Sequence, residues 1–236
     1  MSREEYLPRY RYPVLVIRFS VILHIFVSSR TAALLIFLFF RANVSHKTIC
    51  DWTNKFNGNV DLPTYDYSNI SVLICNVDEK YVKVNGEWNY WWSLKDLLGN
   101  VVHAIVTKCR DFYSARKLLI EARKKIGKDV DILVRDGLPA YNKSTKFLGR
   151  RCKSVIAGIS GKGFIFKKQF YWLTNNSLES LNSEIDFYMG KFQNNFANLE
   201  SANRFANIFM LRKRLKKCFA EKKLSEASSI LKTLVI

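Results

Sequence analysis

The sequence predicts an α/β domain preceded by an all-helical N-terminal segment. Two observations lead to this fold class. Residues 71–157 alternate short β-rich runs with one amphipathic helix, whereas apolar residues within 14–56 recur at helical spacing. A chain of 236 residues, 48% of them hydrophobic, has room for one medium domain and a small accessory one, each with its own core.

The N-terminal segment resembles a DNA-binding helix-turn-helix module. Helices are predicted at 14–27 and 30–40, and a third helix follows Ser45, a residue that favours helix starts. In that third helix Ile49, Trp52 and Phe56 recur every three or four residues and form one apolar face. The outward-facing side chains that we expect to contact DNA are His46, Lys47, Thr48 and Lys55. The same pattern also fits an ordinary helical hairpin.

Residues 14–40 are apolar enough to raise the question of a membrane span. A span needs roughly 20 almost uninterrupted apolar residues, and Arg18, His24 and Arg30 divide this stretch. A signal peptide is disfavoured by the acidic pair at residues 4–5 and by the lack of a small-residue cleavage site. We therefore expect no membrane association.

The order of elements after residue 70 is that of a ribonuclease H-like domain. Three strands in a meander are followed by a helix, a strand, a further strand and then helices. The predicted strands are 71–84, 88–94, 101–108, 130–134 and 152–157, with helices at 111–125 and from 177 onward. We divide the chain into a helical DNA-binding region (1–56), a linker (57–69), the α/β domain (70–215) and a basic helical tail (216–236).

The charge of the chain predicts a polyanionic partner. Lys and Arg number 38 against 20 acids, a formal net charge of +18. Within the basic clusters we expect Arg212, Lys213 and Arg214 to contact phosphates, although such a run also fits a solvated helix face. Five scattered cysteines favour a reducing compartment over a disulfide framework or zinc site. A cytoplasmic, nucleoid-associated protein is the expectation.

Three carboxylates occupy positions where a metal site could form. Asp78 lies near the end of the first predicted strand, Asp136 follows the fourth, and Glu179 falls in the first turn of a late helix. Mg²⁺ prefers oxygen ligands, and two such ions roughly 3.5–4 Å apart can support an in-line displacement at phosphorus. With 20 acids in the chain, however, the bare order Asp, Asp, Glu is not specific.

The residues around these acids resemble transposases of insertion elements, in particular the insertion-sequence-six family with its three-carboxylate (DDE) site. The resemblance covers about residues 30–215. It is carried by 44–52, 77–86, Tyr90-Trp91-Trp92, Asp96, Gly99, 108–111, 135–141, 175–182 and 196–202. The interval between Asp136 and Glu179 is longer than is usual in that family, with 156–173 as the expected extra loop.

The resemblance implies an enzyme that cleaves and joins DNA by direct transesterification. Asp78, Asp136 and Glu179 would be both the catalytic residues and the ligands of two Mg²⁺ ions, which Mn²⁺ could replace. The partners would be double-stranded DNA, as element terminal repeats and target, and a second copy of the chain in a homodimer or higher assembly. Two alternatives stay open: a nuclease that cuts without joining, and an inactive transposase-derived DNA-binding protein.

Several residues have a less specific interpretation. Asp186, seven positions after Glu179 and so on nearly the same helix face, is the rival third acid, whereas Glu184 points away. We expect Glu79 and Asp96 to be structural or supporting residues, and His103 to be a core histidine. The tryptophans expected to be sheet or core residues are Trp88, Trp91, Trp92 and Trp172.

Overall fold

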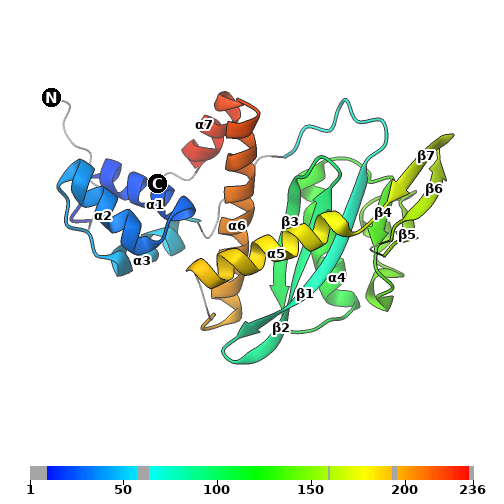
Figure 1. Cartoon of the computed structure of the whole chain (residues 1–236), viewed down its shortest axis with the longest axis horizontal. Coiled ribbons are helices and arrows are strands. Elements are labelled where there is room, and N and C mark those ends of the chain that lie inside the picture. The colour runs from blue at the N-terminus through cyan, green and yellow to red at the C-terminus, as the bar shows by residue number, and fades with distance from the viewer. Residues whose placement is uncertain (1–9, 58–63, 159, 193–195, 234–236) are drawn as a thin grey trace. The chain divides into compact units, whose positions relative to one another are not determined.

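The computed structural model describes residues 10–57, 64–158, 160–192 and 196–233. The chain forms two compact units (Figure 1). The helical unit comprises Met1–Leu62 and Asn207–Ile236, and the sheet unit comprises Pro63–Ala206. The helix α6 (Leu199–Ala220) begins in the sheet unit and ends in the helical unit. The four-part division made from the sequence stays a prediction.

The helical unit contains the three helices predicted at its N-terminus. They are α1 (Val14–Phe26), α2 (Ser29–Phe40) and α3 (His46–Asn57), and the unit also holds the end of α6 and α7 (Leu224–Thr233). The Ser45 hydroxyl accepts a hydrogen bond from the Thr48 amide (3.1 Å), which confirms the predicted start of α3. Ile49 and Trp52 are buried among residues of α1 and α2. No helix in the described ranges is long and apolar enough to cross a membrane.

The five-stranded sheet has the strand order of a ribonuclease H-like domain, β3-β2-β1-β4-β5. Its strands are β1 (Ile74–Val84), β2 (Glu87–Asp96), β3 (Val101–Thr107), β4 (Ile132–Arg135) and β5 (Lys153–Ile156). The first three form an antiparallel meander, and β4 and β5 add in parallel to β1. Asn85 and Gly86 both have positive φ, the conformation that a two-residue hairpin turn of this type requires.

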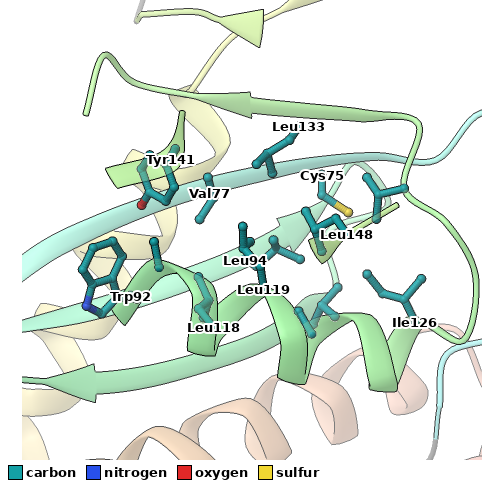
Figure 2. Packing of buried hydrophobic residues seen from close by; sticks show 14 of the residues in the cluster. Cys75, Val77, Trp92, Leu94, Leu118, Leu119, Ile126, Leu133, Tyr141 and Leu148 are labelled. Carbon is teal, nitrogen blue, oxygen red and sulfur yellow. The ribbon is translucent and has the colours of Figure 1, made fainter. Parts of the chain in front are cut away.

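One face of the sheet is covered by α4 (Phe112–Ile126) and holds the main core (Figure 2). Asp111 caps this helix by accepting a hydrogen bond from the Ser114 amide (2.8 Å), as its position in the sequence predicts. Leu118 and Leu119 point from α4 towards side chains of β1 and β2 such as Val77 and Leu94. Residues of two short 3-10 helices, Pro139–Tyr141 and Thr145–Phe147, also pack against this core.

The opposite face carries α5 (Asn176–Phe192) and a hairpin of β6 (Lys162–Phe166) and β7 (Gln169–Leu173). The sequence predicted only a loop at 156–173. Phe164, Phe166 and Tyr171 alternate along the two strands and pack on residues of β1, β4 and β5, and this burial fixes the hairpin. Its turn residues Lys167 and Lys168 both have positive φ, which lysine rarely adopts, so no turn signature marked it.

The structure tests five expectations about single side chains in the sheet unit. Asp96 is buried and accepts hydrogen bonds from Tyr67 and Asn100, a structural role as predicted. Trp91 and Trp92 are buried core residues, also as predicted. Trp88 and Trp172 lie on strands but are not core residues: they are 60% and 64% exposed. Trp88 is on the same face of β2 as the buried Trp92, but it lies at the start of the strand, next to the hairpin turn.

His103 is a core histidine, as expected. It is buried in β3, and its Nδ1 lies 3.1 Å from the Lys125 ammonium, which can only donate, so the imidazole is the acceptor. Burial, together with the positive charges of Lys125 and Lys117, lowers the pKa of His103 to about 3. The ring is therefore neutral in the folded protein.

We predict that His103 makes the sheet unit less stable as the pH falls below about 6.5. The unfolded histidine takes up a proton near its ordinary pKa, whereas the folded one does not, so protonation favours unfolding. Its contribution should be a loss on the order of 1 kcal/mol per pH unit down to about pH 4. Below about pH 6 the raised pKa of Asp78 acts in the opposite direction, so the His103 contribution is measured as a difference between two proteins. Urea unfolding at several pH values should show the wild type losing stability relative to His103→Gln as the pH falls. A difference that does not change with pH would contradict the assignment.

Candidate active site

Asp78 and Asp136 are brought together by the register of β1 and β4. These strands are parallel, with Asn76 opposite Val134. Asp78 lies two residues beyond Asn76 and Asp136 two beyond Val134, so the same register sets the two aspartates side by side. Because β4 ends at Arg135 while β1 continues to Val84, the pair occupies an open edge of the sheet. The two aspartates thus lie together, and their role as metal ligands stays a prediction.

Glu79 is the third member of this carboxylate cluster. One oxygen each from Asp78, Glu79 and Asp136 lie within 4.8 Å of one another. Consecutive residues of a strand point to opposite faces. Beyond the end of β4, however, no strand separates the faces on that side of β1, so the longer side chain of Glu79 approaches the same edge. The sequence predicted only a supporting role for Glu79.

The charge of Glu79 is compensated within the protein. Its Oε1 accepts hydrogen bonds from Arg110, with Nε at 2.7 Å, and also forms an ion pair with that guanidinium. Its Oε2 accepts a hydrogen bond of 2.6 Å from the buried Tyr141 hydroxyl. Arg110 also lies 3.7 Å from Asp136. Sequence reasoning assigned no role to Arg110 or Tyr141, although both stand in the stretches that carry the family resemblance.

The negative charge of Asp78 is less well relieved. Burial raises the pKa of Asp78 to about 6, and the charges of Glu79 and Asp136 act in the same direction. Within the described ranges, the Asn182 side chain of α5 donates to it, with Nδ2 3.0 Å from Oδ2, and this hydrogen bond works against the rise in pKa. Asp136 is half-buried and accepts a hydrogen bond from the Leu138 amide (2.9 Å). A divalent cation here would remove this electrostatic cost.

The structure does not bring Glu179 into the cluster. Glu179 is exposed in the first turn of α5 and is not among the three converging acids, so its place as the third metal-binding acid stays a prediction. The rival Asp186 is not in the cluster either, because it pairs with Lys80. A physical reason is repulsion: a third uncompensated carboxylate beside Asp78 would cost energy that exposure to water avoids.

The predicted DNA-binding side chains separate into two groups. In α3, His46, Lys47 and Lys55 are exposed and Thr48 is half-buried, with Lys55 also donating to the Tyr10 hydroxyl (2.6 Å). In α6, by contrast, Arg212 and Arg214 are buried, and only Lys213 is partly exposed.

The expectation of phosphate contacts is therefore wrong for Arg212 and Arg214. Arg212 donates to the Phe26 carbonyl (2.9 Å), and Arg214 pairs with Glu226 (2.8 Å). Their guanidinium groups are used inside the helical unit, where a buried charge needs such partners. A run of basic residues in a sequence does not reveal that use.

The donor set at the sheet edge suits a hard divalent cation. Carboxylate oxygens are the ligands that Mg²⁺ prefers, and three of them converge here without a full complement of positive partners.

Comparisons with known proteins identify relatives of the sheet unit and of much of the rest of the chain. A family model for the DDE domain of insertion-sequence transposases matches residues 72–233, more than half of the chain. Among curated proteins none matches.

Solved structures that match this chain include retroviral proteins at 14% sequence identity. One is the HTLV-2 integrase catalytic core domain in complex with magnesium, in its trimeric form (TM-score 0.38, covering 56% of this chain and 74% of that one). The dimeric form matches with a TM-score of 0.39 over 63% and 86%. The simian T-cell lymphotropic virus intasome in complex with PP2A regulatory subunit B56 gamma matches with 0.41 over 73% and 60%.

We predict that Mg²⁺ or Mn²⁺ stabilises the protein through this cluster. A cation held at 100 times its Kd would add about 2.7 kcal/mol to the free energy of unfolding. Thermal unfolding with and without the metal measures the shift, which Asp136→Asn should abolish. The control Asp51→Asn changes an exposed aspartate of α3 and should keep it. An equal shift in both variants would place cation binding elsewhere.

Proposed function

This chain belongs to the DDE transposases of insertion sequences, enzymes that cut DNA with divalent metal ions, and we propose that it binds the terminal repeats of its element and transfers the cut strand to target DNA. The observation that carries this proposal is the side-by-side placement of Asp78 and Asp136 at the open sheet edge. The joining step would be a direct transesterification, in which a freed 3′-hydroxyl attacks a target phosphate and displaces the oxygen on its other side.

We further propose that Asp78, Asp136 and Glu179 hold two Mg²⁺ ions, which Mn²⁺ can replace. When bound, such ions activate the attacking oxygen and stabilise the leaving one. Support for Glu179 comes from Asn182, which follows it by three positions. Three positions correspond to about 60° around the helix and about 4.5 Å along it. Glu179 therefore lies one turn before Asn182 and close to the helix face that contacts Asp78.

The remaining residues at the edge position the two aspartates. Arg110 and Tyr141 hold Glu79 and neutralise its charge, which leaves Asp78 and Asp136 as the acids with capacity for a cation. The Leu138 amide orients Asp136. Lys80 donates to the Asn182 carbonyl (3.1 Å) and pairs with Asp186, so α5 is held on β1 at its contact with Asp78 and one turn beyond it.

In this proposal double-stranded DNA is bound by both units of the chain. The exposed His46, Lys47 and Lys55 of α3 would lie at the element end, with Thr48 beside them, and Lys213 would contact phosphate. Base edges are distinguished by side chains that enter the major groove, while phosphate contacts place the helix. Two element ends would be paired by two copies of the chain, or by a larger assembly.

The proposed function is tested by a strand-transfer assay. The protein is incubated with labelled element ends, plasmid target DNA and Mn²⁺, and the products are separated by size. Joined products support transposition. Cleaved ends without joined products would assign the chain to the nucleases of this fold, and neither product would assign it to DNA binding alone.

We predict that Glu179→Gln abolishes cleavage and joining while DNA affinity and the unfolding midpoint stay unchanged. The substitution removes a charge from an exposed side chain and changes its volume little. Loss of a catalytic metal ligand should lower the rate by at least about a hundredfold. Asp186→Asn is the matched comparison on the same helix. If that variant is inactive and Glu179→Gln is active, Asp186 is the third acid.

We predict that Lys47→Ala with Thr48→Ala reduces discrimination between element ends and random DNA. Direct contacts to base edges contribute about 1–3 kcal/mol each, so the preference should fall about tenfold or more. Arg30→Ala with Thr31→Ala is the control, because Ser28 caps Thr31 at the start of α2 as Ser45 caps Thr48. Competition binding measures both. If both variants keep the same preference for element ends over random DNA, α3 does not take part in sequence recognition.

A further inference from the structure

The β6–β7 hairpin presents a large apolar surface to solvent. Ile165, Phe170 and Trp172 are 70%, 65% and 64% exposed. They lie on one side of the hairpin, because Ile165 pairs with Phe170 and Gly163 pairs with Trp172 across the two strands. We call these three side chains the outer face of the hairpin. Clustered exposure of this kind marks interaction sites, whereas single exposed apolar residues are ordinary.

The outer face is shaped by two glycines beneath the aromatic rings. A Cβ on Gly163 would lie 3.0 Å from the Phe170 ring, and one on Gly161 would lie 2.7 Å from Nε1 of Trp172. Gly161 also has a φ of +78°, which glycine adopts freely. The rings of Phe170 and Trp172 lie 6.5 Å apart at 35°. Their position against bare backbone leaves their outward faces available for stacking.

The hairpin is fixed in place by its opposite side. Phe164, Phe166 and Tyr171 pack on the sheet, and the Lys167 ammonium bonds Asp131 (2.9 Å) and the Ser71 carbonyl (3.2 Å). The outer face is therefore a rigid platform. Binding to it would cost little conformational entropy in the protein.

Charge identifies the class of partner. Between Asp136 and Glu179 the sequence has no acidic residue, while eight are basic: Lys143, Lys146, Arg150, Arg151, Lys153, Lys162, Lys167 and Lys168. An aromatic platform in so positive a segment fits a polyanion that also carries flat apolar groups. Single-stranded DNA has both, since its unpaired bases stack on aromatic rings and its phosphates are drawn to basic side chains.

We propose that the outer face of the β6–β7 hairpin stacks unpaired bases of DNA beside the cleavage site. This inference rests on the proposed function, since an enzyme that opens and rejoins strands meets unpaired bases at its cuts. The hairpin lies in the chain between Asp136 and Glu179, and β7 leads directly into α5. Asn76, two residues before Asp78, donates to the Thr174 carbonyl at this junction (2.7 Å).

The test is the affinity for a fluorescent single-stranded oligodeoxythymidine, measured by anisotropy in EDTA. No cleavage occurs there, so failure of the proposed chemistry leaves the result interpretable. Phe170→Ala with Trp172→Ala should weaken single-strand binding about tenfold or more, and duplex binding about twofold or less. The control Trp88→Ala removes another exposed tryptophan, from β2, and should change neither.

Replacement by leucine distinguishes stacking from general apolar contact. Phe170→Leu with Trp172→Leu keeps an apolar surface and lacks aromatic faces, so single-strand affinity should still fall. Unchanged affinity in the alanine variant, or full affinity in the leucine variant, would overturn the proposal. Sedimentation of the same folded variants tests the alternative that the outer face binds a second copy of the chain. Loss of self-association with intact single-strand binding would assign the outer face to a contact between copies.

Discussion

The parallel pairing of β1 with β4 is the constraint on which the site depends. A shift of one residue would turn Asp136 away from Asp78, since side chains alternate between faces along a strand. The register is maintained by packing on both faces: Val77 and Leu133 belong to the core under α4, while Ile74 and Val134 pack beneath the hairpin. The apolar sequence of these strands thus sets the spacing of two charged groups that lie outside the core.

Charge balance then determines which acids share the sheet edge. Two carboxylates 4 Å apart repel by about 4 kcal/mol at an effective dielectric constant of 20. Glu79 stays beside Asp78 because Arg110 and Tyr141 offset its charge, and the raised pKa of Asp78 reflects the cost that is left. No residue in the described part of the chain offers Glu179 such a partner at the edge. Its exposure is therefore consistent with a residue that would join the two aspartates only alongside a cation.

The regular elements and two of the site acids could be predicted because local sequence determines them. Period-two and period-3.6 patterns placed the five strands and α3 to α5, and the ends of two predicted strands marked Asp78 and Asp136. The remaining errors concern tertiary contacts. Nothing local shows that Arg214 pairs with Glu226, and the turn of the hairpin uses two lysines in a conformation that sequence rules assign to glycine or asparagine.

The strand that carries Asp78 also holds α5 and the junction that leads into it. Asn76 holds the Thr174 carbonyl where β7 becomes α5, and Lys80 holds the Asn182 carbonyl further along that helix. Lys95 of β2 adds a contact to the Ser177 carbonyl (3.1 Å). In each of these three contacts, a side chain of the sheet donates a hydrogen bond to a main-chain carbonyl of α5 or of the residues just before it. The helix that bears Glu179 and the hairpin before it are thus fixed relative to Asp78 by alternate residues of one strand. An insertion between Asp136 and Glu179 can therefore lengthen the chain without displacing the acids that flank it.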